Sequence, residues 1–265
     1  MHEIGFGIIE ILTLAAAATG ACCLLAFVLR KRLGGRRPLW VRWGAELFVV
    51  VGLVLSARVA LADWQQVPTG SMEPTIRVGD YLLVNKLAYG PRLPFTNTAL
   101  DLGEPQRGDV VVFRYPLDVS QFYVKRLVGL PGDVVQFRAG AVSVNGQPFQ
   151  VALDGDALRR PEDAGQVFVR EQAAGVERVI KVDASRPGGR VPPQAWQADP
   201  QHCVVQSTQA WTCRVPEGRF LMMGDNRDNS ADSRVWGFLD RREIYGKAAR
   251  VLVNFSDLRR SWSAL

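Results

Sequence analysis

The hydrophobic and polar positions divide the chain into an apolar N-terminal part and a longer part with a strand-like pattern. Residues 4–29 contain one charged residue, Glu10, and residues 43–62 contain two, Glu46 and Arg58. A helix that crosses a bilayer core of about 30 Å needs about 20 residues, which both segments supply. Their charges lie near segment ends, where long side chains can reach the interface. The pattern therefore predicts two membrane-spanning helices, over residues 4–29 and 43–62.

The loop between the two segments, residues 30–42, predicts their orientation. It carries six positive charges and no negative one, as many as the net charge of the whole chain, +6. Positive loops stay in the cytoplasm, so the residues after 62 are expected outside it. A cleaved signal peptide is disfavoured for the first segment by its length and its acidic start. A buried core helix remains the alternative for the second.

Composition narrows the class of protein. An apolar fraction of 48% with 22% charged residues excludes a disordered chain. A pI near 9.4 is typical of nucleic-acid-binding proteins. Because the excess charge lies in residues 30–42, the rest of the chain is close to neutral and we expect no nucleic-acid partner.

The region after residue 62 is predicted to be mainly β, because short runs rich in β-branched residues alternate with turns of Gly, Pro and Asn. Such spacing favours a coiled antiparallel sheet or barrel-like domain over βαβ units. We expect one β domain built from 63–145 and 219–265, with a second β domain inserted at 146–218. The predicted strands are Tyr81–Val84, Asp109–Tyr115, Phe122–Val128, Val134–Phe137, Val142–Val144, Val167–Val169 and Arg178–Val182.

Cysteine and histidine limit the possible chemistry. Cys203 and Cys213 lie in the outer region, where they form either a disulfide or two free thiols, and the oxidising compartment favours the disulfide. Only His202 lies beside them, which disfavours a metal site, and His2 precedes the first segment. Zinc-hydrolase spacings are absent from the sequence. We expect neither a metal ion nor a cofactor, and any hydrolase here needs Lys, Asp or Glu as its base.

Two residues are candidates for nucleophilic catalysis. Ser71 lies between Pro68 and Pro74, which hold the backbone open and disfavour helix. Lys125 lies on the predicted strand 122–128 between apolar neighbours on one face, and burial lowers the pKa of a lysine enough to make it a base. A juxtamembrane linker and an edge-strand lysine are the alternatives. Lys181 has similar apolar flanks, so flanks alone do not select Lys125.

Four segments together resemble the signature boxes of bacterial type I signal peptidases, which are Ser-Lys dyad proteases. The resemblance covers the two-span anchor, residues 1–62, and the β domain of 63–145 and 219–265, but matches the insert only in position. Some members also have a disulfide near the position of the cysteine pair. The segments are Pro68–Thr75, Arg107–Phe113, Tyr123–Asp133 and Gly224–Arg234.

The resemblance implies a role for each matching residue. Ser71 would be the nucleophile, Lys125 the general base, and Ser230 the residue that orients the lysine. The Ser71 N–H and the hydroxyl of Thr69, where the family has a serine, would form the oxyanion hole. Asp232 and Arg234 would form a structural ion pair. The substrate pocket would be lined by Val67, Pro68, Met72, Ile76, Tyr123 and Val124.

The implied function is a membrane-bound endopeptidase that removes signal peptides from exported preproteins after small residues, at an A-x-A site. Its implied place is the bacterial inner membrane, with the catalytic domain on the periplasmic side near the secretion translocon. The partners would be signal peptides and the lipid bilayer. Two alternatives stay open: a related Ser-Lys maturation peptidase of pilus or conjugation systems, and a catalytically silent membrane-tethered scaffold.

Overall fold

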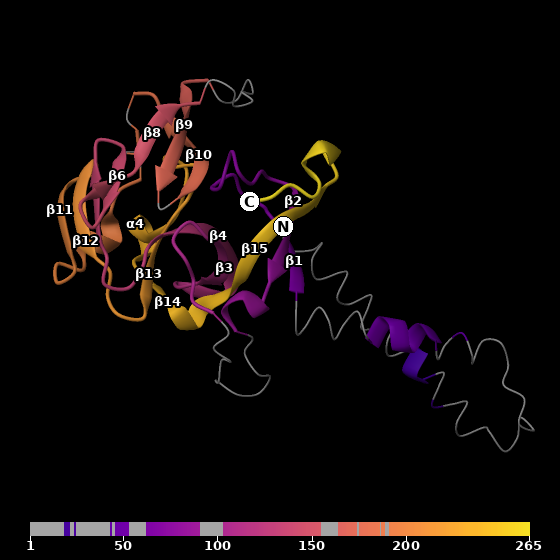
Figure 1. The fold of residues 1–265 in the computed structure, drawn as a ribbon. Helices are drawn as coiled ribbons and strands as arrows, with labels where there is room; N and C mark the ends of the chain where they lie inside the picture. Colours follow the sequence, from indigo (N-terminus) through magenta and orange to yellow (C-terminus); the bar gives the residue numbers. More distant parts are fainter. Residues whose placement is uncertain are drawn as a thin grey trace, which may run out of the picture. The chain divides into compact units, whose positions relative to one another are not determined.

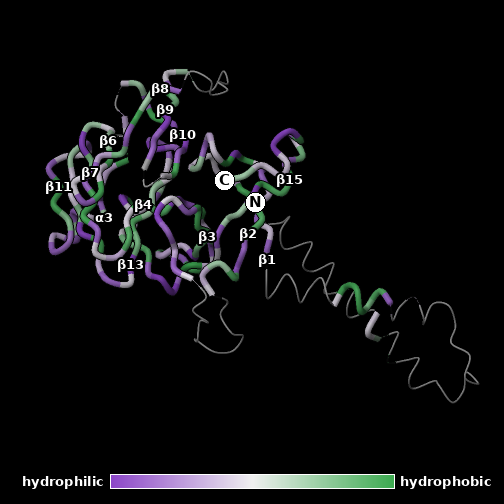
Figure 2. The backbone as a smooth tube through the Cα atoms, in the orientation of Figure 1, coloured by the Kyte–Doolittle hydropathy of each residue, from purple (hydrophilic) through white to green (hydrophobic). Residues whose placement is uncertain are grey.

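The structure, a computed structural model, describes residues 19–21, 24, 43, 46–52, 62–90, 103–154, 164–173, 175–185, 187–188 and 191–265 (Figure 1). The chain forms two units, Met1–Gln65 and Gln66–Leu265. In the first unit, the described residues before 53 are helical, and those at 46–52 are mostly hydrophobic (Figure 2). In this described part of the chain, no helix is both long and apolar enough to cross a bilayer.

Most of the predicted anchor therefore lies outside the described residues. Residues 30–42 lie outside them entirely, as do most of 4–29 and eleven residues of 43–62. The two membrane spans and the basic loop remain predictions. Strand β1 (Ala62–Gln66) begins the described β structure.

The second unit is mainly β, as the turn-rich pattern predicted. All seven predicted strands are confirmed, most of them one to four residues longer at an end. The strands are β2 (Asp80–Asn85), β3 (Val110–Tyr115), β4 (Asp118–Gly129), β5 (Val134–Arg138), β6 (Ala141–Val144), β7 (Gln147–Pro148), β8 (Gln150–Leu153), β9 (Gln166–Ala173), β10 (Val176–Asp183), β11 (Cys203–Ser207), β12 (Ala210–Arg214), β13 (Arg219–Met223), β14 (Leu239–Asp240) and β15 (Ile244–Asn254).

Helices in the second unit are short. Two are α-helices, α3 (Gln194–Gln197) and α4 (Ser233–Trp236). Three are 3₁₀ turns, η2 (Leu87–Tyr89), η4 (Arg241–Glu243) and η5 (Leu258–Arg260). None separates parallel strands within the described residues, in agreement with the prediction against βαβ units.

The central sheet of the second unit runs β2-β15-β3-β4-β13-β14, with antiparallel neighbours throughout. Both faces of β3 are buried. Val110 and Val112 pack in one core cluster, and Val111 and Phe113 pack in another. A strand segment with consecutive apolar residues is buried on both of its faces. The site described below is built on β4, the neighbour of β3 in this sheet.

Two smaller sheets complete the unit (Figure 1). One runs β10-β9-β8, and the other runs β11-β12-β5-β6-β7. The second of these pairs β12 with β5, so it joins strands from both sides of the boundary predicted at residue 146. The division into 63–145 with 219–265 and an insert at 146–218 remains a prediction.

Candidate active site

Ser71 lies in a loop between β1 and β2 whose two ends are joined. The Val67 N–H donates to the Asp80 carbonyl at 2.9 Å, and the Ile76 N–H donates to the Met72 carbonyl at 3.0 Å. The side chains of Met72 and Ile76 are completely buried in the core cluster beside β2 and β15. Apolar side chains on both sides of the turn therefore hold Ser71 in place.

Lys125 reaches Ser71 from β4. Its Nζ lies 2.7 Å from the Ser71 Oγ and 2.9 Å from the Val124 carbonyl oxygen. The Nζ also lies 5.2 Å from the centre of the Tyr123 ring, as expected for two residues on one face of a strand. Both reacting side chains are buried, with Ser71 8% exposed and Lys125 3% exposed.

Burial controls the charge of Lys125. Removal from water lowers its pKa from 10.5 to about 8, although the negative charges of Asp232 and Asp225 act in the opposite direction. Because burial disfavours the charged amine, a useful fraction of Lys125 is neutral near neutral pH. A neutral amine 2.7 Å from a serine hydroxyl can accept its proton.

The segment 224–227 packs against the Ser71 loop. The Asn226 N–H donates to the Ser71 carbonyl at 3.1 Å, and the Asn226 Nδ2 donates to the Gly70 carbonyl at 3.0 Å. A Cβ placed on Gly224 would lie 2.4 Å from the Ser71 carbonyl oxygen and 2.2 Å from the Ser230 Oγ. Only glycine fits such an approach. Gly224 and Asn226 belong to the motif Gly224–Arg234, but the sequence did not indicate that they contact the Ser71 loop.

Asp232 and Arg234 form the ion pair that the resemblance implied. Arg234 Nε and Nη2 lie 2.8 and 2.7 Å from the two carboxylate oxygens of Asp232, and both residues are fully buried. Asp232 also accepts from the Gly224 N–H at 3.0 Å and caps α4. Burial acts to raise the pKa of Asp232, but the charge and hydrogen bonds of Arg234 outweigh it and the pKa is lowered.

A second buried ion pair, Arg126 with Asp225, was not predicted from the sequence. Arg126 Nη2 and Nε lie 2.6 and 2.8 Å from the Asp225 oxygens, and Arg126 also donates to the Gly108 carbonyl at 2.8 Å. The Thr75 Oγ1 donates to Asp225 at 2.6 Å. Arg126 follows Lys125 directly in the sequence. No local feature distinguished it from an arginine on the solvent-exposed face of a strand. This pair ties β4 to both the Ser71 loop and segment 224–227.

The two predicted oxyanion-hole donors make no hydrogen bond within the residues that the structure describes. Neither the Ser71 N–H nor the Thr69 hydroxyl donates to a described residue, and Thr69 is exposed. Ser230 is buried, and its Oγ has no hydrogen-bond partner among the described residues. A buried hydroxyl without a partner is costly, so such groups usually serve a function.

The predicted pocket residues divide between two parts of the core. Val67, Met72 and Ile76 are buried in the cluster that Val124 also joins, whereas Tyr123 packs against a different cluster. Pro68 is exposed beside the loop. The structure thus brings four of the six side chains together under the Ser71 loop.

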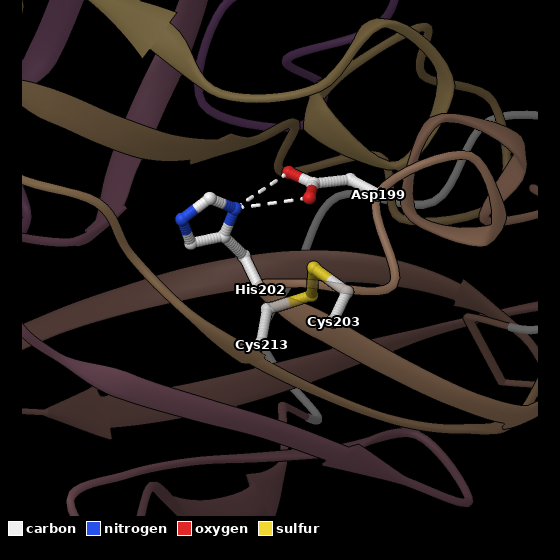
Figure 3. Close-up of a disulfide and its surroundings, with 4 residues drawn as sticks. All are labelled: Asp199, His202, Cys203 and Cys213. Atoms are coloured by element: carbon white, nitrogen blue, oxygen red, sulfur yellow. Dashed lines mark hydrogen bonds and ion pairs between the residues drawn. A yellow bond between two sulfur atoms is a disulfide. The ribbon is translucent and has the colours of Figure 1, made fainter.

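Cys203 lies on β11, Cys213 lies on the neighbouring strand β12, and His202 lies in the turn before β11. Cys203 and Cys213 face each other on paired strands and form a disulfide, as favoured from the sequence (Figure 3). His202 Nδ1 lies 2.9 Å from an Asp199 carboxylate oxygen, so this histidine is held by Asp199 and not by a serine (Figure 3). The described residues contain no group of side chains that could hold a metal ion.

Comparisons with known proteins identify the family of this chain. The family described as signal peptidase, peptidase S26, matches residues 40–253. Signal peptidase I of Pseudomonas aeruginosa is 39% identical over 239 residues, which cover 85% of this chain and 77% of that protein. Signal peptidase I of Aquifex aeolicus is 34% identical over 218 residues, which cover 77% of this chain and 80% of that protein. A solved signal peptidase I from Enterococcus faecalis V583 is 26% identical, covers 54% of this chain and 96% of that chain, and has a TM-score of 0.30.

A buried serine beside a buried lysine on a β scaffold is the arrangement expected of a serine hydrolase that uses an amine as its base. The chain belongs to the signal peptidase family, peptidase S26. The resemblance found in the four motifs is thereby confirmed, and the protein is a peptidase of the serine type.

Proposed function

We propose that this protein removes signal peptides from exported preproteins with a Ser71–Lys125 dyad. The observation that carries the proposal is the 2.7 Å distance between Lys125 Nζ and Ser71 Oγ, with both side chains buried. Lys125 in its neutral form takes the hydroxyl proton while Ser71 attacks the scissile carbonyl. The protonated lysine then donates to the leaving amine, and a water activated by Lys125 hydrolyses the acyl-enzyme.

The developing oxyanion is stabilised by the Ser71 N–H and the Thr69 hydroxyl in this mechanism. Both donors are without partners among the described residues, so they are available to a substrate oxygen. Donors that already point at the oxyanion stabilise the transition state without further rearrangement. The proposed role of Ser230 is to orient Lys125: its buried Oγ makes no hydrogen bond to Lys125 or to another described residue, so it is able to accept one from the lysine amine.

Small residues at an A-x-A site are the proposed substrate signature. The signal peptide binds as an extended strand, so alternate side chains enter pockets shaped by Val67, Pro68, Met72, Ile76, Tyr123 and Val124. We propose that these pockets are shallow, so that they accept alanine and exclude larger side chains.

We also propose that residues 4–29 and 43–62 tether the enzyme to the bacterial inner membrane, with residues after 62 on the periplasmic side. The basic loop 30–42 supports this orientation. The Cys203–Cys213 disulfide supports an oxidising compartment. In that place the enzyme meets signal peptides as they leave the translocon. A reporter fused after Leu265 should be active only outside the cytoplasm, and cytoplasmic activity would reverse the topology.

Cleavage of a purified preprotein tests the catalytic proposal. Wild-type protein should cut at the A-x-A site, and Ser71→Ala and Lys125→Ala should each remove cleavage. Undiminished cleavage in both variants would overturn the dyad. An inactive, folded wild type would favour the membrane-tethered scaffold instead. Circular dichroism on each variant separates lost chemistry from lost folding.

A further inference from the structure

Lys181 lies on β10, in the segment predicted as an insert, and contacts the catalytic part of the chain. Its side chain is buried, and its Nζ lies 3.2 Å from the Glu73 Oε2, two residues after Ser71. Granted the proposed peptidase function, we propose that Lys181 is a positioning residue that holds the Ser71 loop in its reactive geometry. This would give the insert a part in catalysis.

The backbone of Lys181 makes the first connection. Lys181 pairs with Asn226 in a parallel bridge. The Lys181 N–H donates to the Asp225 carbonyl at 2.9 Å, and the Lys181 carbonyl accepts from the Arg227 N–H at 2.9 Å. Segment 225–227 therefore pairs with the edge of β10 in the way that a neighbouring strand does. Its position depends on the position of β10.

Asn226 carries the connection to the nucleophile. It sits between β10 and the loop, with its backbone N–H on the Ser71 carbonyl at 3.1 Å and its side chain on the Gly70 carbonyl at 3.0 Å. These two bonds fix the peptide units on both sides of the Ser71 Cα, and the first of these units contains the Ser71 nitrogen. That nitrogen carries the proposed oxyanion donor, so a displacement of Asn226 moves the donor as well.

The side chain of Lys181 makes a second, independent connection through Glu73. The Glu73 N–H donates to the Gly70 carbonyl at 3.1 Å, and a Cβ placed on Gly70 would lie 3.1 Å from the Glu73 carboxyl carbon. The carboxylate thus lies against the backbone that precedes Ser71. Its ion pair with Lys181 joins this carboxylate to β10.

β10 itself is rigidly anchored near this contact. Glu171 on β9 accepts from Arg178 Nε of β10 at 2.8 Å and from Arg227 Nη2 at 2.6 Å. All three side chains are buried. One carboxylate therefore joins β9, β10 and segment 225–227, and Lys181 extends from this fixed strand to the loop.

Kinetics of the full-length chain in detergent, with a peptide that contains an A-x-A site, tests the proposal. Lys181→Met should lower kcat about 10- to 100-fold with KM changed less than about twofold, because misplacement of a reacting group by about 1 Å costs rate rather than binding. Glu73→Gln should lower kcat in the same direction. The double variant should be no slower than Lys181→Met alone, and Lys181→Arg should restore most of kcat.

Arg170→Met is the matched control. Arg170 lies on β9 of the same sheet, is 44% exposed, and pairs with Asp154 and Glu177 outside the Ser71 loop. It should leave kcat unchanged. Equal kcat values for Lys181→Met and Arg170→Met, or a loss in Lys181→Met matched by its unfolded fraction, would overturn the positioning role.

Hydrogen exchange separates this inference from the proposed function. Peptides that cover residues 70–76 should lose protection in Lys181→Met but keep it in Arg170→Met, whereas peptides that cover 224–229, which the Lys181 backbone holds, should keep it in both. That result holds even if the wild type cuts no peptide, in which case only the proposed function fails. Unchanged protection of residues 70–76 in Lys181→Met would overturn the inference while wild-type cleavage stands.

Discussion

Two buried lysines, on β4 and β10, differ in the residue each one meets. Lys125 is 3% exposed and Lys181 is 7% exposed, and each Nζ lies within hydrogen-bonding distance of the Ser71 loop. Lys125 meets the neutral Ser71 hydroxyl, and burial lowers its pKa to about 8. Lys181 meets the Glu73 carboxylate and forms an ion pair. The same residue type thus meets a hydroxyl on one strand and a carboxylate on another, in keeping with the proposed roles of base for Lys125 and positioning residue for Lys181.

The largest expected effect separates the two lysines directly. Lys125→Met should lower kcat/KM by about 10³-fold or more, because among the described residues the Ser71 hydroxyl is hydrogen-bonded to no titratable group except Lys125. Lys181→Met should retain measurable turnover. Initial rates with one A-x-A peptide, normalised to folded protein, measure both. Equal losses of kcat/KM in the two variants would contradict the assignment of Lys125 as the base and Lys181 as a positioning residue.

The next effect concerns the loop that both lysines contact. Thr69→Val should lower kcat about 10²-fold, which is typical for removal of one oxyanion donor, while KM stays near the wild-type value. Thr69→Ser keeps the hydroxyl and serves as the control, with nearly full activity expected. A Thr69→Val enzyme as fast as wild type would show that the Ser71 N–H stabilises the oxyanion without Thr69.

The pKa of Lys125 predicts a smaller, pH-dependent effect. kcat/KM should rise with pH through about 8, because only the neutral amine accepts the Ser71 proton. At pH 7 about one tenth of Lys125 is neutral. A pH–rate profile with no inflection between 7 and 9 would contradict this assignment.

The same pKa shift predicts how stability changes with pH. Lys125 titrates near its ordinary value of 10.5 when unfolded and at about 8 when folded. Between these values the unfolded chain binds more protons, so the free energy of unfolding should rise with pH from about 8 to 10.5. Urea titrations across this range should show the rise in wild type and a smaller one in Lys125→Met.

The smallest effect on activity is expected far from both lysines. Replacing Cys203 and Cys213 together by serine should lower the free energy of unfolding by about 2–3 kcal/mol, because the bond closes a loop with a sequence separation of 10. kcat at 25 °C should stay near wild type. Urea unfolding measures the first quantity, and a large loss of kcat in a folded variant would connect the five-stranded sheet to the site.

The sequence pattern predicted the strands that are short apolar runs between turn residues, and it missed several strands that depart from this pattern. β3 and β5 are short, apolar and bounded by turns, and both were expected. β15 was missed, because its residues shift register against both neighbours and Gly246, Lys247 and Arg250 interrupt the alternation. β13 has four consecutive buried residues, a run that reads equally well as strand or helix.

The four motifs and the apolar face of strand 122–128 were readable in the primary sequence, because residue type and alternation are local properties. Alternation showed which face of β4 Lys125 occupies, but not that Ser71, 54 residues earlier, lies opposite. Nothing local distinguished Lys181, whose partner Glu73 is 108 residues away. Only the fold decided which lysine meets a hydroxyl and which meets a carboxylate, since both contacts join segments that are brought together by packing of separate strands.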